Sequence, residues 1–136
     1  MPEKLFALML RRVRPSFALV SELAGEFQTS LRATATCCAE VTDDYWAVVV
    51  SECGRIRWWR GSESFEERFW IESGALLSPK SVAGSVFRGE PVPTGPREVE
   101  RDVWAECREG YEHDALVEEV LPLPAYDQIL SLLYLP

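Results

Sequence analysis

The sequence predicts an α+β protein, in which an N-terminal helical segment (residues 1–43) precedes an antiparallel sheet of about five to six strands with a short covering helix (residues 44–136). Three observations indicate this fold class. Apolar side chains recur at helical spacing before residue 44, two apolar runs flank a glycine between Tyr45 and Arg60, and further β-rich segments follow to the end of the chain. We therefore expect a helical part and an α+β part.

The N-terminal segment predicts three short helices. Residues 2–13 and residues 17–27 each carry one apolar stripe, and Pro15 separates them. Ser30 is placed as the N-cap of a third helix over residues 31–41. The pattern SELAGEFQTSLRATATCCAE, which covers most of the last two helices, is similar to a helix-turn-helix.

The stretch YWAVVVSECGRIRWWR predicts the central β-hairpin. Its first run is almost entirely apolar and β-branched or aromatic, which is typical of a central strand that is covered on both faces. Gly54 supplies the backbone freedom of a tight turn, so the two runs are expected to pair antiparallel.

The second run alternates and predicts a strand nearer the edge of the sheet. Ile56 and Trp58 are expected to share the inward face, which would make Trp58 a core residue. Arg55, Arg57 and Trp59 are expected on the other face, where the guanidinium groups can stack on the Trp59 ring.

The remaining chain predicts four more strands and one helix. A short strand is expected at residues 67–72, and a helix at residues 79–88 with Ser78 as its cap and Gly89 as its stop. Further strands are expected at residues 99–107, around Trp104, and at residues 115–123 and 128–135.

The charge is unevenly distributed. Residues 1–36 carry five Lys/Arg and three Asp/Glu, a net charge of +2, whereas residues 37–136 carry nine against nineteen, a net charge of −10. An acidic body repels phosphate groups, so contact with DNA is disfavoured outside the N-terminal segment. No run approaches the roughly 18 apolar residues of a membrane span, and no secretory leader is recognisable, so we expect a cytoplasmic protein without a membrane partner.

No catalytic or metal-binding motif stands out. The four cysteines, at positions 37, 38, 53 and 107, lack zinc-ligand spacing, and His113 is the only histidine. The carboxylates fall mainly in runs such as Glu63, Glu66 and Glu67, or Glu118 and Glu119, which are typical of solvated faces. We therefore expect no catalytic residues, no metal and no cofactor.

Several segments resemble the carboxy-terminal part of ImmA/IrrE proteins. The motifs are Met1-Pro2 with Phe6, LAGEFQTSL, AVVVSECGRIRWWRGSESF, SVFRGEPVPTGP, VWAE and LPLPAYDQILSLLYL. The resemblance implies a helix-turn-helix-like segment followed by a GAF-like sensor domain. Members of that family carry an N-terminal zinc metallopeptidase domain with a HExxH helix, which this chain lacks, and the resemblance therefore implies a regulatory module that does not cleave protein.

Three kinds of binding are open to such a module. The first is a small-molecule site on the sheet, with Trp59, Arg55, Arg57, Trp46 and Trp104 as candidate ligand-binding residues. The second is DNA binding, with Gln28, Ser30, Arg32, Arg11, Arg12 and Arg14 as candidate contacts. The third is binding to a protein, either a separate peptidase domain or another regulator. The leading hypothesis is a non-catalytic sensor or regulatory module that binds a ligand or a protein, and the alternatives are a DNA-binding regulator and a fragment of a split zinc metallopeptidase gene.

Overall fold

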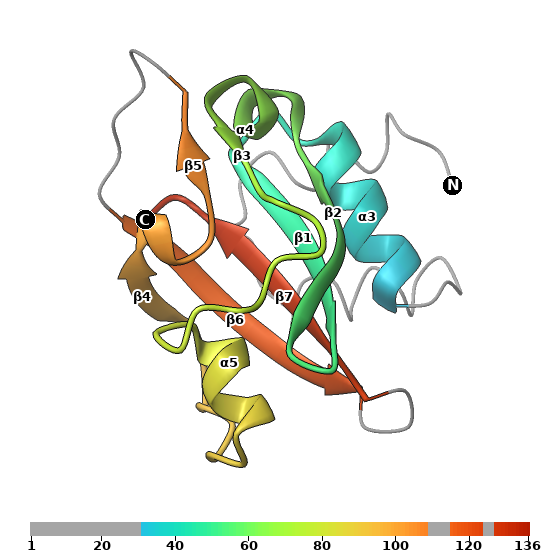
Figure 1. Ribbon diagram of the computed structural model, residues 1–136. Coiled ribbons are helices and arrows are strands. Elements are labelled where there is room, and N and C mark those ends of the chain that lie inside the picture. The colour runs from blue at the N-terminus through green and yellow to red at the C-terminus, as the bar shows by residue number, and fades with distance from the viewer. Residues whose placement is uncertain (1–30, 109–114, 124–126) are drawn as a thin grey trace.

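The computed structural model describes residues 31–108, 115–123 and 127–136 (Figure 1). Within these ranges the fold is α+β, as predicted, with a five-stranded antiparallel sheet, a second sheet of two strands and three α-helices. None of the described helices is long and apolar enough to cross a membrane. The helices predicted over residues 2–13 and 17–27, the Ser30 cap and His113 lie outside the described residues.

The main sheet has the strand order β2-β1-β7-β6-β4, with all neighbouring strands antiparallel. Its strands are β1 (Trp46–Glu52), β2 (Arg55–Gly61), β4 (Arg97–Glu100), β6 (Ala115–Leu123) and β7 (Gln128–Tyr134). The two runs of the predicted hairpin are β1 and β2. As predicted, β1 is a central strand, buried almost throughout, and β2 lies at the edge. The strands predicted at residues 115–123 and 128–135 are β6 and β7.

The hairpin contains a β-bulge that the sequence pattern did not indicate. Val50 pairs with Trp58, whereas the next residue, Ser51, pairs with Ile56, so Arg57 is the extra residue on β2. Because the extra residue shifts the alternation of side chains, Ile56 and Trp58 pack into different hydrophobic clusters on opposite faces of the sheet. The prediction that these two residues share an inward face was wrong for this reason.

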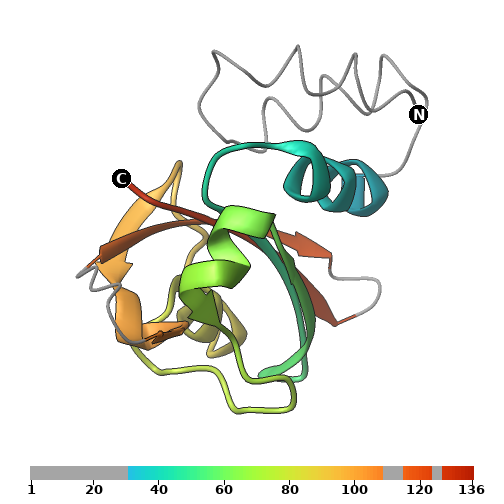
Figure 2. The ribbon, with the colours of Figure 1, turned by 90° about the horizontal axis from the view of Figure 1, so that it is seen from above.

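The two faces of the main sheet are covered by different elements. α3 (Leu31–Val41), which confirms the helix predicted over residues 31–41, packs on one face over β1 and β2 (Figure 2). The opposite face is covered by α4 (Glu63–Arg68), by α5 (Val82–Phe87) and by the small sheet of β3 (Phe69–Trp70) and β5 (Glu106–Cys107). We call these sides of the sheet the α3 face and the α4 face.

The structure also corrects two of the predicted strands. Residues 67–72 were expected to form a strand, but α4 continues to Arg68 and leaves only β3 as extended chain. The strand predicted over residues 99–107 is interrupted by the 3-10 helix η1 (Arg101–Val103) between β4 and β5. In both places a short helix replaces part of the strand because its backbone closes local hydrogen bonds, such as those from Trp104 N and Ala105 N to Arg101 O.

The helix predicted over residues 79–88 is present as α5, but its N-cap differs. The Ser81 hydroxyl oxygen accepts a hydrogen bond from Gly84 N at 2.9 Å, so Ser81, not Ser78, caps the helix. Ser78 supports the preceding turn, where its carbonyl accepts a bond from the Ser81 hydroxyl at 2.7 Å. Gly89 follows the helix with a φ of 92°, as expected of a glycine that ends a helix.

Candidate functional site

The candidate ligand-binding residues predicted from the sequence do not form one pocket. Trp46 is buried in the cluster on the α3 face, whereas Trp104 and Trp59 pack in the cluster on the α4 face. The sheet therefore separates Trp46 from the other two rings. The structure therefore does not bring these three rings together around one ligand.

Arg55 and Arg57, two of the three arginines of β2, also have other partners. Arg55 donates from Nη1 to Gly74 O at 3.1 Å, and Arg57 forms an exposed ion pair with Glu52 at 3.1 Å. Trp59 instead packs edge-on against Phe65, with ring centroids 6.2 Å apart. The predicted stack of Arg55 and Arg57 on Trp59 was therefore wrong, because the bulge turns Trp59 toward the packed α4 face.

Arg32 is the only candidate DNA contact within the described residues. Its guanidinium carbon lies 4.8 Å from the centre of the Trp58 ring, a cation–π arrangement between α3 and β2. The five other candidates, Gln28, Ser30, Arg11, Arg12 and Arg14, lie outside the described residues.

A group of exposed carboxylates gathers where α3 ends and α4 begins, and we call it the acidic corner. α3 and the turn that follows it contribute one side, and α4 contributes the other (Figure 1). Its members are Glu40, Asp43, Asp44, Glu63, Glu66 and Glu67, all exposed.

Ser62 fixes the two sides of the acidic corner to one another. This residue is fully buried, and its Oγ accepts bonds from Trp46 N and Phe65 N, both at 3.2 Å. The same hydroxyl donates to Asp44 O at 2.6 Å. Ser62 thus caps α4 and at the same time holds the turn before β1. These hydrogen bonds limit how far the backbone segments that carry the acidic side chains can move apart.

Gly61 lets α4 approach the edge of the sheet closely. A Cβ at this position would lie 2.9 Å from Glu66 Cγ and 3.0 Å from Phe65 Cδ1. The resulting surface is an open hollow of about 470 Å³ lined by Glu40, Arg60, Gly61, Glu63, Glu66 and Glu67. Arg60 contacts Glu40 at 3.7 Å, but the side chains of the three α4 glutamates form no ion pair with any described residue.

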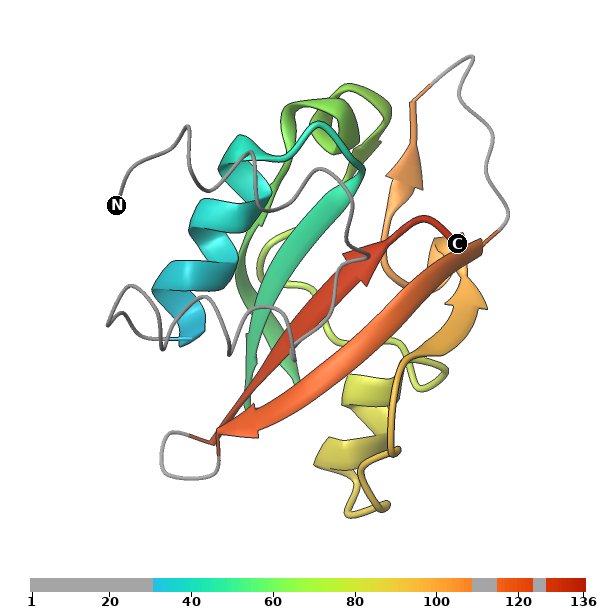
Figure 3. The same cartoon turned by 180° about the vertical axis from the view of Figure 1, so that it is seen from behind.

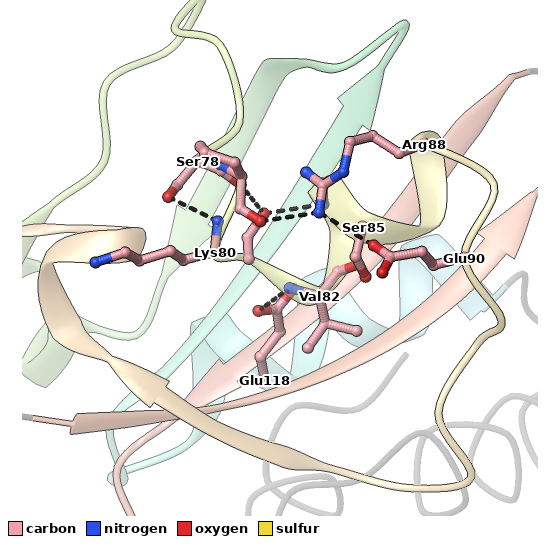
Figure 4. A network of polar contacts seen from close by, with 10 residues as sticks. Ser78, Lys80, Val82, Ser85, Arg88, Glu90 and Glu118 are labelled. Atoms are coloured by element: carbon pink, nitrogen blue, oxygen red, sulfur yellow. Dashed lines mark hydrogen bonds and ion pairs between the residues drawn. The ribbon is translucent and has the colours of Figure 1, made fainter.

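Glu118 forms a second polar centre, which lies inside the molecule (Figure 4). The side chain is fully buried on the α4 face, between the sheet and the first turn of α5. Oε1 accepts bonds from Val82 N at 2.9 Å and Trp104 Nε1 at 2.8 Å, and Oε2 accepts one from Ala83 N at 2.9 Å. Burial raises the pKa of Glu118, and the three N–H donors partly oppose this effect.

The sequence interpretation of Glu118 as a solvated residue was wrong. Glu118 lies on the same face of β6 as the buried Leu116, two residues earlier, and this alternation was the available signal. The adjacent Glu119 made the pair look like an exposed run. Because all three hydrogen bonds are to donors of the same chain and the carboxylate is buried, Glu118 serves the fold.

Two of the described thiols, Cys38 and Cys53, are poorly suited to nucleophilic chemistry. Burial raises the pKa of Cys38 to about 12, and the hydrogen bond to Asp127, at 3.1 Å, raises the pKa of Cys53. Both thiols therefore stay protonated at neutral pH. None of the four cysteines forms a disulfide, and the described residues contain no group of three or more metal-ligating side chains.

Comparisons with known proteins add no relative. No family model matches the chain, and no curated protein matches it. The resemblance to ImmA/IrrE proteins therefore rests on the sequence motifs alone and stays a prediction.

Proposed function

We propose that this chain is a non-catalytic binding module that receives a basic segment of a protein partner at the acidic corner. The observation that carries the proposal is the hollow of about 470 Å³, whose wall presents three α4 glutamates that form no ion pair with any described residue. Unpaired carboxylates at a concave surface attract a cationic chain and hold it by charge-assisted hydrogen bonds.

The rigidity of the corner supports this proposal. The Ser62 bonds and the close contact at Gly61 hold the turn before β1, the end of β2 and α4 in one arrangement. A preorganised surface loses little conformational entropy when a partner binds. Arginine or lysine side chains of the partner would replace water around Glu63, Glu66 and Glu67.

The other functions considered receive less support. A small-molecule site built from the sheet tryptophans lacks a common pocket, because Trp46 and Trp104 lie on opposite faces. DNA binding would have to overcome the net charge of −10 over residues 37–136, and Arg32 is engaged with Trp58. If the resemblance to ImmA/IrrE proteins holds, the partner at the acidic corner is a separate peptidase domain or a regulator protein.

A pair of charge-matched variants tests the proposal. The probe is a fluorescein-labelled nonapeptide of mixed lysine and arginine, and its fluorescence anisotropy is followed during titration with the whole protein. We expect the variant E63Q/E66Q/E67Q to weaken binding by about tenfold or more, since each exposed charge pair contributes up to about 1 kcal/mol. Added salt should weaken the wild-type complex as well.

The control removes the same charge elsewhere. E98Q/E100Q/D102N alters three exposed acidic residues on β4 and η1, and should leave the affinity within about twofold of the wild type. Equal losses in the two variants would show that net charge alone attracts the peptide, and the acidic corner would then lose its assigned role.

A further inference from the structure

Trp70 is the tryptophan that the fold places at the surface. It is 41% exposed, whereas the other four tryptophans are buried or half-buried. Alternation along β3 explains this placement, because Phe69 packs into the cluster on the α4 face and Trp70 points the other way. An exposed indole keeps a large apolar area in contact with water, and a partner that covers this area gains affinity.

The Trp70 ring is held by contacts on β5. Trp70 pairs with Glu106 in the small sheet, and the guanidinium carbon of Arg108 lies 5.5 Å from the centre of the Trp70 ring. Arg108 is fixed in turn by α4, since its backbone N donates to Arg68 O at 2.7 Å and its Nε donates to Glu66 O at 3.1 Å. The indole therefore loses little conformational entropy when a partner covers it.

The exposed indole adjoins the acidic corner. β3 follows α4 directly, so Trp70 comes three residues after Glu67. The bond from Arg108 to Glu66 O joins the residue that contacts the Trp70 ring to the helix that carries the glutamates. Seen from behind, α4 (green) and β5 (orange) lie at the same end of the molecule, as they do in Figure 1 (Figure 3). A segment bound at the acidic corner can thus extend onto Trp70.

We infer that the basic segment received at the acidic corner carries an aromatic residue beside its cationic residues, and that this aromatic residue packs on Trp70. The inference rests on the proposed function. Arg108 sets the chemistry at the indole, because its positive charge repels a lysine or arginine of the partner there. An uncharged aromatic ring instead packs against the indole and stacks with the guanidinium group. The α4 glutamates and Trp70 therefore select different residues of the same partner.

Peptides that differ at one residue test the inference. The lysine–arginine nonapeptide is extended by one phenylalanine at its N-terminus or at its C-terminus, and each decapeptide has a counterpart with serine in that place. We expect one phenylalanine peptide to bind the whole protein at least about fivefold more tightly than its serine counterpart. Equal affinities of the phenylalanine and serine peptides at both ends would overturn the inference.

Two variants locate the gain in affinity. Trp70→Ala should remove the advantage of phenylalanine and leave the affinity for the serine peptides within about twofold of the wild type. Leu76→Ala truncates an apolar residue that is 67% exposed elsewhere, and should preserve the advantage. An advantage of phenylalanine that persists in a folded Trp70→Ala protein would contradict the assignment of Trp70.

Crosslinking to the unaltered chain decides the question even if Trp70→Ala fails to fold. The photoreactive residue benzoylphenylalanine replaces phenylalanine in the tighter peptide, and its adducts with the wild-type protein are mapped by mass spectrometry. We expect adducts within residues 68–72 and 106–108. Adducts confined to other parts of the chain would overturn the inference.

The inference and the proposed function fail in different ways. If the serine peptides lose affinity for E63Q/E66Q/E67Q and phenylalanine adds nothing, the acidic corner keeps its role and the aromatic contact is wrong. If the serine peptides bind this variant as tightly as the wild type, the proposed function is wrong, and the inference that rests on it is overturned with it.

Discussion

Glu118 joins three parts of the chain at one side chain. β6 carries the carboxylate, α5 supplies the Val82 and Ala83 amides, and the end of η1 supplies the Trp104 indole. A buried carboxylate is costly unless its oxygen atoms are satisfied, and here three N–H groups perform that task. The first turn of α5 is thus held to the sheet by a side chain distant in sequence.

The raised pKa of Glu118 should make the free energy of unfolding depend on pH. The folded-state pKa of Glu118 is raised above the ordinary 4.5, so folding favours the protonated form. The stabilisation that comes from proton uptake is fully present below about pH 4.5 and is lost as the pH rises through the folded-state pKa. Glu118→Gln removes the titration and leaves one donor, such as Ala83 N, facing an amide nitrogen, at a cost of about 1–3 kcal/mol near pH 7.

Urea unfolding of both proteins at about pH 5 and about pH 7 measures this effect. The free energy of unfolding of the wild type minus that of the Gln variant should be larger at the lower pH. The other carboxylates titrate alike in both proteins, so they cancel in this difference. Glu98→Gln, at an exposed position, should show no such pH-dependent difference. If the difference between wild type and Gln variant instead grew as the pH rose, the three hydrogen bonds would lower the pKa of Glu118 by more than burial raises it.

Trp58 and Trp59 show how far one residue can change a prediction. A strict alternation along β2 placed Trp58 with Ile56, but the single extra residue Arg57 moves Trp58 to the α3 face and Trp59 to the α4 face. Both rings end half-buried, one beneath Arg32 and the other beside Phe65. Sequence alternation cannot locate a bulge when both neighbours of the extra residue are equally apolar.

At the scale of elements, the long strands and the helix at residues 79–88 were predictable, whereas α4 and the exact ends of α5 were not. β1, β6 and β7 are seven to nine residues long and rich in apolar residues, which is typical of strands in a sheet interior. α4 has six residues, and α5 also has six, so neither spans two full turns of periodicity. Their caps, Ser62 and Ser81, were the better signal.

The acidic corner was only half visible in the sequence. Glu63, Glu66 and Glu67 were recognised as an exposed run, which is correct. The turn with Asp43 and Asp44 lies beside these glutamates for two reasons. β1 pairs antiparallel with β2, and the Ser62 hydroxyl donates a hydrogen bond to Asp44 O, 18 residues earlier in the chain. Such long-range juxtaposition has no local sequence signature.

α5 offers a test of close packing at the element scale. An alanine inside an exposed helix normally stabilises it by about 0.8–1 kcal/mol relative to glycine. At Gly84, however, a Cβ would lie 2.5 Å from the backbone oxygen of Ser78 and 2.8 Å from Ser81 Oγ. We expect Gly84→Ala to lower the free energy of unfolding by about 1–3 kcal/mol, because a backbone carbonyl cannot move aside cheaply.

Thermal or urea unfolding of Gly84→Ala measures the change. Gly54→Ala provides a useful comparison, since no atom lies within 4 Å of a Cβ there and its cost comes from the φ of 78° alone. A stabilised Gly84→Ala protein would show that α5 shifts freely on the sheet, contrary to the anchoring by Glu118.

At the scale of the whole molecule, the sheet separates two kinds of surface. On the α3 face the side chains of β6 and β7 belong to an apolar cluster, whereas the acidic corner is open to solvent. The net charge of −8 for the chain therefore understates the local charge at the corner. Association with a basic partner should be fast at low salt and should slow as salt screens the glutamates.

The most direct test of the binding proposal is to locate the bound peptide on the protein. Two-dimensional NMR of the ¹⁵N-labelled chain, titrated with the unlabelled lysine–arginine nonapeptide, reports each backbone amide separately. The proposal expects the largest shift changes at residues 40–44 and 60–67, and small changes at β4 and α5. Shift changes spread evenly over every acidic surface, or concentrated away from α4, would contradict the assignment of the acidic corner as the binding site.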